Sequence, residues 1–266
     1  MAARWGVLGL GQMAQALLKP ALASGALPAD QVVACVRRPE RAAALSAEFG
    51  VPVGIDPRPV GSATNLLLAV KPQQLEGVVE QLSREGATAP GLLVSILAGV
   101  NLQRLQRSFP TRRCVRAIPN MPCRIQQGLT GICWGDGLSA VQQQRVRDVF
   151  QCVGSIEELS ESQCDAFLAL ASSGPGLAAV VVEAFADGAV AAGLPRQQAL
   201  AVTRRMLAGT MALLDQEDLH PAALKDAVCS PGGATILGVA VLERNGLRGA
   251  LIEAIRATTA RSRELA

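Results

Sequence analysis

The chain has few aromatic rings and few groups that titrate near neutral pH. Among its 266 residues there is no tyrosine, aromatic residues make up 3%, and histidine occurs once, as His220. Half of the residues are nevertheless hydrophobic, so the core must consist mainly of Ala, Leu and Val, which suit helices that pack at short distances. A chain of this length can bury a real core, in one large or two small domains.

A strong charge of either sign is also missing, because 25 Lys and Arg face 22 Asp and Glu. Without a basic cluster interleaved with aromatic residues, we expect no binding to nucleic acid. No secretory signal is recognisable ahead of the first expected strand, so we expect a cytoplasmic protein. The apolar run 166–182 is interrupted at 173–176 (SGPG) and bounded by Asp165 and Glu183. We therefore expect two buried helix pieces there and no membrane partner.

The cysteines form no CxxC pair and no pairing with histidine. Their odd number and irregular spacing argue against a disulfide framework and against a structural zinc site. We therefore expect a reduced, intracellular protein without a metal. The seven positions are 35, 114, 123, 133, 152, 164 and 229.

Short β-like runs alternate with amphipathic helical stretches over the first 160 residues, which predicts a parallel sheet with helices on both faces. Strands are expected at 4–9, 32–36, 65–70, 92–96, 114–117 and 129–133, with helices at 13–24, 41–49 and 75–84. After about Leu159 only helices are expected, at 162–172, 177–192, 196–216, 221–227 and from 235 to the end, with a break near Gly246. Pro195 suits a helix start and Gly246 a helix stop.

The first expected strand leads directly into a glycine-rich turn. Residues 4–18 read RWGVLGLGQMAQALL and contain Gly9-x-Gly11-x-x-Ala14, the dinucleotide fingerprint with Ala in its third place. Gly9 allows the tight turn, Gly11 allows close approach of a pyrophosphate, and Ala14 allows the helix to pack on the strand. The alternative is a glycine-rich turn without a ligand. The residues expected to contact the cofactor here are Gly9, Leu10, Gly11, Gln12 and Met13.

The second expected strand ends in Arg37 and Arg38, where an NAD site usually has an acid. Guanidinium groups bind phosphate in a bidentate fashion, so this pair favours NADPH over NADH. The alternative is that both arginines merely solvate the end of a strand.

A second glycine turn, Ser230-Pro231-Gly232-Gly233-Ala234-Thr235, opens into an apolar helix. Adjacent glycines let the backbone approach a ligand closely, and the free N–H groups of the helix start bind small anions such as a carboxylate. The hydroxyls of Ser230 and Thr235 can donate or accept. The alternative is that these hydroxyls cap the helix.

Across residues 221–243 (PAALKDAVCSPGGATILGVAVLE) the chain resembles the C-terminal signature of pyrroline-5-carboxylate reductases, which make L-proline by reducing a cyclic imine with NAD(P)H. Residues 69–72 (AVKP), 94–100 (VSILAGV) and 116–122 (RAIPNMP) resemble further segments of that family. Two departures are Leu97, where the family often has a small residue, and 172–177 (SSGPGL), which lacks an aromatic residue. The further cofactor contacts implied by the resemblance are Ala69, Val70, Lys71, Pro72, Ile96, Leu97, Ala98 and Asn120.

The resemblance implies an N-terminal Rossmann-type doubly wound sheet that binds NAD(P) (1–159) and an all-helical dimerisation and substrate-binding domain (160–266). It also implies a homodimer or a larger ring of dimers. The substrate carboxylate would be held by the turn Ser230, Gly232, Gly233, Ala234 and Thr235. The Thr235 hydroxyl would bond the ring nitrogen, and Glu161 matches a family position near the substrate amine. Glu161 is equally explained as an acid in the first turn of a helix.

Other assignments stay open. His220 is the sole candidate among histidines for a general acid, but it precedes a proline in a loop, where solvation explains it as well. Cys229 is expected to be an inert buried thiol. Another imine or hydroxyacid reductase on the same scaffold is an alternative function, although Lys225 is the only lysine in the helical half and lies at neither glycine turn. A nucleotide-binding regulator without catalysis is a third.

Overall fold

The structure is a computed structural model that describes residues 5–264. Arg4, with which the first strand was expected to begin, and residues 265–266, expected in the last helix, lie outside the described residues. The chain forms two compact units. One comprises the residues up to Ser173 together with those from Thr258 on, and the other is Gly174–Ala257.

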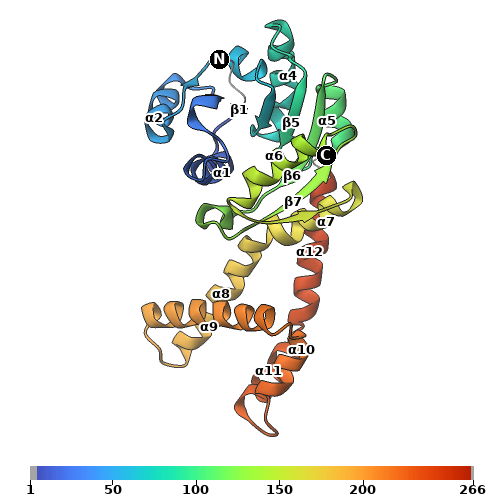
Figure 1. Ribbon diagram of the computed structural model, residues 1–266. Coiled ribbons are helices and arrows are strands. Elements are labelled where there is room, and N and C mark those ends of the chain that lie inside the picture. The colour runs from blue at the N-terminus through green and yellow to red at the C-terminus, as the bar shows by residue number, and fades with distance from the viewer. Residues whose placement is uncertain (1–4, 265–266) are drawn as a thin grey trace. The chain divides into compact units, whose positions relative to one another are not determined.

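The first unit is built on one eight-stranded sheet with the order β3-β2-β1-β4-β5-β6-β7-β8 (Figure 1). Its strands are β1 Trp5–Leu8, β2 Val32–Cys35, β3 Val53–Gly54, β4 Asn65–Leu68, β5 Gly91–Ser95, β6 Arg112–Ile118, β7 Gly128–Trp134 and β8 Gly154–Glu158. All six expected strands are confirmed in their described residues, and the sequence analysis missed β3 and β8. The last strand ends before residue 160, as expected.

One pairing departs from the expected parallel sheet, because β6 and β7 run antiparallel. Only the short segment 119–127 joins these two strands, and it contains the 3-10 turn η3 (Met121–Ile125). A parallel pairing needs a crossover of a dozen or more residues, so a connection of this length returns the chain antiparallel. The other strand pairs are parallel.

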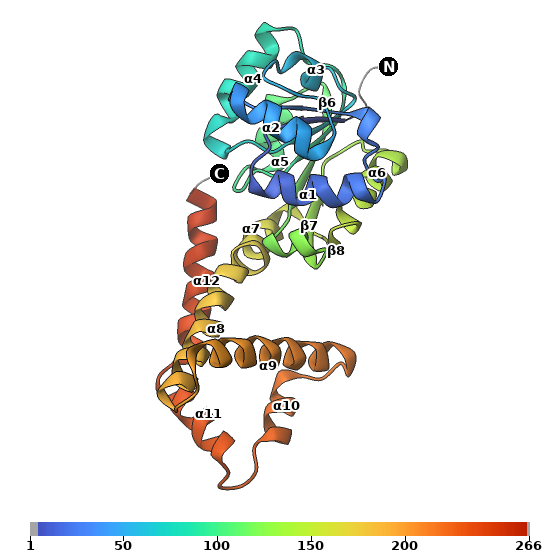
Figure 2. The ribbon, with the colours of Figure 1, turned by 90° about the vertical axis from the view of Figure 1, so that its left-hand side faces the viewer.

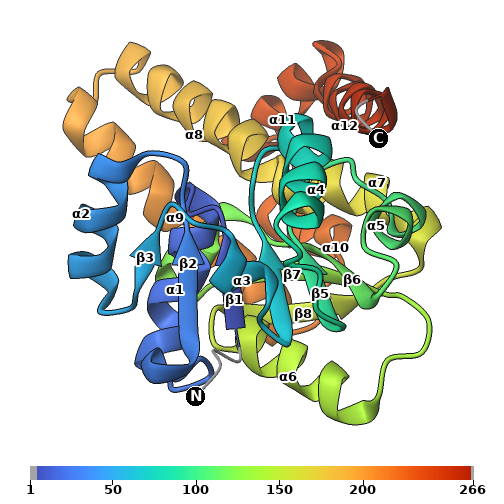
Figure 3. The same cartoon turned by 90° about the horizontal axis from the view of Figure 1, so that it is seen from above.

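Helices cover both faces of the sheet, as the doubly wound prediction requires. Because successive side chains of a strand point to opposite faces, Leu67 of β4 packs into one core, while Leu66 and Leu68 pack into the other. The first core lies under α1 (Gln12–Ala23), α2 (Pro39–Phe49) and α6 (Ala140–Gln151). The second lies under α3 (Arg58–Gly61), α4 (Leu75–Arg84) and α5 (Leu102–Ser108). Figure 3 shows α6 and α4 on opposite sides of the strands.

Beyond β8 the first unit continues as a short helical segment with three kinds of turn. It comprises the 3-10 turn η4 (Glu161–Gln163), α7 (Cys164–Phe167) and the π-helical η5 (Leu168–Ser172). Two other 3-10 turns of this unit, η1 (Ala29–Gln31) and η2 (Pro72–Gln74), lie earlier in the chain. The side chains of Cys164 and Leu168 pack with Ile118 and Cys133 in a small third core. This segment corresponds to the helix expected at 162–172.

The second unit is all helical, as expected. It contains α8 (Gly174–Ala191), α9 (Arg196–Gln216), α10 (Pro221–Val228), α11 (Ala234–Arg244) and the first part of α12 (Leu247–Glu264), and Figure 2 shows the turn that joins α10 to α11. Pro195 is the N-cap of α9, and Gly246, with φ of +71°, separates α11 from α12. Both breaks confirm the sequence-based prediction.

Few side chains of the second unit are buried within a single chain. From α8 to α11 the described buried residues are Ala186, Ala199 and Thr203. One helical stretch, Glu161–Ala191, is long and apolar enough to span a membrane by length and composition, and 17% of its most apolar window is buried. The two helix pieces expected to be buried are therefore only partly buried in one chain, where Leu168 and Ala169 are buried but Leu170 and Val180 are about two-thirds exposed. Apolar helix faces of this extent are typical of a protein–protein interface.

Candidate functional site

A cavity of about 480 Å³ opens at the carboxyl ends of β1, β2 and β4. The strand order of the sheet reverses between β1 and β4. In open α/β sheets this switch point is where ligands bind. Eight of the expected cofactor residues line the cavity: Gly9, Leu10, Gly11, Arg37, Arg38, Ala69, Val70 and Lys71.

The glycine-rich turn after β1 leaves open space for a ligand. Gly9 has φ of +93°, and a Cβ there would lie 2.7 Å from the carbonyl oxygen of Ala69, so a side chain is excluded. A Cβ at Gly11 would meet nothing within 4 Å. Helix α1 follows at once, with no side-chain cap and no acid in its first turn, so its first amides are free to bind an anion. Ala14 of α1 is buried in the core that contains Val7 of β1, as the fingerprint requires.

Three arginines line the cavity beyond the second strand. Arg41, from the first turn of α2, joins Arg37 and Arg38, and the lining contains no Asp or Glu. The nearby Asp56 is engaged by Arg58 at 2.7 Å, and these hydrogen bonds lower the pKa of the Asp56 carboxyl. A cluster of guanidinium groups without a carboxylate in the lining suits a phosphate group. The sequence analysis missed Arg41, although its position three residues after Arg38 at a helix start was a usable signal.

The other seven expected cofactor residues lie outside this lining, and Gln12 and Asn120 among them are described below. Met13 is half-buried in α1, Pro72 opens η2, and Ile96 is half-buried after β5, while Ala98 is exposed. The side chain of Leu97, the residue that departs from the family pattern, is 2% exposed and packs in the core under α4 and α5. Its size is therefore accommodated by the core.

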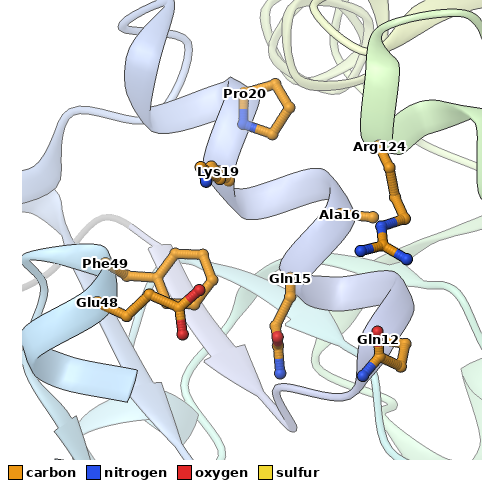
Figure 4. A pocket seen from close by; sticks show the side chains of 8 residues that line it. All are labelled: Gln12, Gln15, Ala16, Lys19, Pro20, Glu48, Phe49 and Arg124. Atoms are coloured by element: carbon orange, nitrogen blue, oxygen red, sulfur yellow. The ribbon is translucent and has the colours of Figure 1, made fainter. Parts of the chain in front are cut away.

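Gln12 lines a different and smaller cavity, of about 190 Å³. This cavity lies along α1, where Glu48 of α2 is placed across from Gln15, and Arg124 of η3 lies near Gln12 (Figure 4). Lys19 also lines it. The lining of this cavity therefore contains charged side chains of both signs.

Asn120 is buried and its amide group is used within the chain. Its carbonyl oxygen accepts the N–H of Leu129 at 2.9 Å, and its Nδ2 donates to the carbonyl of Ala171 at 3.1 Å. The Ser172 hydroxyl donates to the carbonyl of Pro119 beside it. Through these two hydrogen bonds, Asn120 joins β7 to η5.

Glu161 belongs to a charge cluster around a buried arginine. Arg116, whose side chain is 3% exposed, bonds Glu161 Oε1 at 2.5 Å and lies 3.5 Å from Asp165 Oδ1. The last turn of α12 joins the cluster, because the Ser262 hydroxyl donates to Asp165 at 3.0 Å, and Arg263 lies 3.7 Å from it. A guanidinium group as deeply buried as that of Arg116 needs a charged partner. Glu161 therefore holds Arg116 in place, in addition to any role toward a ligand.

The second glycine turn lies in the helical unit, between α10 and α11. Gly232 has φ of +67°, which favours glycine, and the N–H of Gly233 donates to the carbonyl of Ser230 at 3.0 Å. A Cβ at Gly233 would lie 2.3 Å from Ser230 Oγ, so the hydroxyl and the backbone approach closely. Gly233 is itself the N-cap of α11.

Neither hydroxyl of this turn caps the helix, which removes the structural alternative for Ser230 and Thr235. In the described part of the chain both hydroxyls are without a hydrogen bond. The first amides of α11, from Ala234 on, are left without intrahelical partners. The turn therefore presents free donors from both backbone and side chains to an anion.

Two neighbouring residues differ from expectation. The His220 side chain is the N-cap of α10, since its Nδ1 accepts the N–H of Ala222 at 3.2 Å; this explains the histidine without a catalytic role. Cys229, expected to be buried, is partly exposed within the single chain.

The chain is similar to known proteins over its whole length. A family model for pyrroline-5-carboxylate reductase dimerisation matches residues 161–265, and one for the coenzyme F420-dependent NADP oxidoreductases matches residues 4–99. The chain is 40% identical to a pyrroline-5-carboxylate reductase of Synechocystis sp. (100% of this chain, 99% of the relative) and 33% identical to one of Escherichia coli (98% and 97%).

Comparison with solved structures points to the same family as the sequence comparisons. A 1-pyrroline-5-carboxylate reductase of Streptococcus pyogenes superposes with a TM-score of 0.87 at 29% identity, over 97% of each chain. The fold is also that of a Plasmodium falciparum pyrroline carboxylate reductase solved with NADP bound (TM-score 0.89, 23% identity, 99% and 98% covered). This chain belongs to the pyrroline-5-carboxylate reductase family.

Proposed function

We propose that this protein reduces 1-pyrroline-5-carboxylate to L-proline with NADPH, the final step of proline biosynthesis. The observation that carries the proposal is the turn before α11. There Gly232 takes a left-handed conformation, a side chain at Gly233 would displace the Ser230 hydroxyl, and two hydroxyls lie unpaired beside free amides. Such a turn has no structural need for its hydroxyls, whereas a small carboxylate can use the amides and the Ser230 hydroxyl.

The cavity of the first unit fits NADPH. Open space at Gly11 and the free amides of α1 match a pyrophosphate. The three arginines of the lining match a 2′-phosphate, although Arg38 also lies 3.8 Å from the exposed Glu40 outside the lining. When bound, NADPH supplies the hydride that reduces the C=N carbon. We assign pyrophosphate contact to the backbone from Gly9 to Met13, and the 2′-phosphate to Arg37, Arg38 and Arg41. NADH lacks that phosphate and is the weaker cofactor.

The substrate is held by backbone amides rather than by a strong acid. We assign its carboxylate to the amides of Gly233, Ala234 and Thr235 with the Ser230 hydroxyl, and its ring nitrogen to the Thr235 hydroxyl. A protonated imine accepts hydride without a further proton, so orientation supplies much of the acceleration. Glu161 would stabilise the positive nitrogen, but Arg116 already neutralises one of its oxygens, which limits that contribution.

A second copy of the chain is part of the proposal. The apolar side chains of α8 to α11 that are exposed in one chain would be buried against a second copy. The match to the dimerisation family model spans these helices. We therefore propose a homodimer, or a larger ring of dimers, through the region 160–266. We place the enzyme in the cytoplasm, which fractionation of cells with an antibody against the protein would test.

The direct test mixes purified protein, NADPH and pyrroline-5-carboxylate. We expect loss of the absorbance of reduced nicotinamide and formation of one proline per NADPH consumed. Loss of NADPH without proline would contradict the proposal and favour another imine or hydroxyacid substrate. Binding of NADPH without turnover would favour a non-catalytic regulator.

A further inference from the structure

Three side chains that can ligate a metal meet beside the Arg116 ion pair. They are Cys133 of β7, Glu161 of η4 and Cys164 of α7, and their ligand atoms all lie within 4.8 Å of one another. Both cysteines are buried, whereas the Glu161 side chain is 38% exposed. The cluster therefore has a closed sulfur side and one side that is open to solvent.

The local fold explains why these groups converge. Glu161 and Cys164 are three residues apart across the junction of η4 and α7, a spacing that puts side chains on one face of a helical turn. Cys133 faces them from the sheet, in the same small core as Cys164. No spacing motif in the sequence contains these three residues, which is why the cysteine pattern gave no sign of a metal site.

The two oxygens of Glu161 have different surroundings. Oε1 bonds Arg116, while Oε2 lies 3.6 Å from the Cys133 sulfur and 3.3 Å from the amide nitrogen of Leu102. Both oxygens are thus engaged, because Oε2 accepts hydrogen bonds from the Leu102 N–H and from the Cys133 thiol. A cation could use Oε2 without breaking the ion pair.

The charges of the cluster also permit a cation. Both sulfurs are buried, and the Cys133 thiol donates to Glu161 Oε2, so a cation bound here would take the place of the thiol protons. A divalent cation that displaces both protons leaves the total charge of the cluster unchanged. Sulfur ligands select soft or borderline cations, whereas Mg²⁺ and Ca²⁺ require oxygen ligands.

We propose that Cys133, Cys164 and Glu161 form a binding site for a thiophilic divalent cation of the Zn²⁺ or Cd²⁺ class, with a fourth position open to solvent. With Zn–S bonds of about 2.3 Å, two thiolates of a tetrahedral site lie roughly 3.8 Å apart. Since the three ligand atoms already lie within 4.8 Å, side-chain movements of about 1 Å complete the site. The cation would join β7 to η4 and α7.

The test uses the full-length protein, freshly reduced and freed of metal, and Cd²⁺ as the probe. Titration should produce a thiolate-to-metal charge-transfer absorption that saturates at one Cd²⁺ per chain. Cys133→Ser and Cys164→Ser should each abolish tight binding. The control Cys229→Ser alters a thiol of the helical unit, remote in sequence from the cluster, and should bind Cd²⁺ like the unaltered protein.

Glu161→Gln keeps both thiols and the shape of the side chain. It should retain the charge-transfer band and weaken binding by at least about 10- to 100-fold, the loss found when only an outer-shell partner of a metal site is changed. Circular dichroism of each variant separates loss of binding from loss of folding. No saturable band in the folded, reduced protein would overturn the proposal, as would binding that survives both cysteine substitutions. These readouts do not involve turnover, so they stand whether or not the proposed reduction is correct.

Discussion

Replacing Arg37, Arg38 and Arg41 by alanine removes every guanidinium group that lines the cofactor cavity. All three side chains are exposed, so each contact with a 2′-phosphate is partly screened by water. We assign about 1 kcal/mol of binding free energy to each contact, a value between that of an exposed ion pair and that of an enclosed charged hydrogen bond. The sum of about 3 kcal/mol corresponds to a loss of roughly 100-fold in kcat/KM for NADPH.

NADH provides the internal comparison, because it lacks the 2′-phosphate and its kcat/KM should barely change. The assay follows loss of reduced nicotinamide with pyrroline-5-carboxylate at fixed ionic strength, since added salt weakens exposed contacts. Arg145→Ala is the matched control; it removes one exposed arginine from α6, outside the lining. Equal losses with both cofactors, or no loss with NADPH, would refute the assignment of the phosphate to these arginines. Arg41→Ala alone should reduce the preference about fivefold.

Three further outcomes follow from the substrate turn and the charge cluster. Thr235→Ala should lower turnover by about 10- to 100-fold through loss of a charged hydrogen bond, with NADPH binding in calorimetry unchanged; unaltered turnover would exclude its role. Gly233→Ala pushes the Ser230 hydroxyl away and should raise KM for pyrroline-5-carboxylate about tenfold, so an unchanged KM would contradict the carboxylate site. Arg116→Met should lower the free energy of unfolding in urea by about 2–3 kcal/mol, less than for fully buried pairs because Glu161 can be hydrated; a neutral effect would show that Arg116 is dispensable.

The sequence was sufficient to predict those features of the structure that depend on residues close together in the chain. The glycine turns at 9–11 and 232–233 follow from local backbone geometry, and their motifs predicted both the cavity at the sheet and the turn before α11. Strand β3, with two residues, is too short for a periodic pattern. Strand β8 (Gly154–Glu158) has no buried residue, so it lacked the hydrophobic alternation by which strands are recognised.

Contacts between residues that are far apart in sequence could not be predicted. Arg116, Asp165 and Ser262 are far apart in sequence, yet they share one cluster, and no local pattern links them. Hydrophobicity also predicted burial of the run 166–182 but could not distinguish a core from an interface. In one chain Leu168 of this run packs in the third core, but most of its other side chains are at least partly exposed.

The most direct measurement of the central claim compares 1-pyrroline with pyrroline-5-carboxylate, since the two differ only in the carboxylate assigned to the amides before α11. With NADPH held saturating, we predict that kcat/KM for 1-pyrroline is at least about 100-fold lower, as expected from losing two charged hydrogen bonds of about 1.5 kcal/mol each. We further predict that Gly233→Ala reduces this difference about tenfold. Equal rates with the two imines would contradict the claim that the glycine turn binds the substrate by its carboxylate.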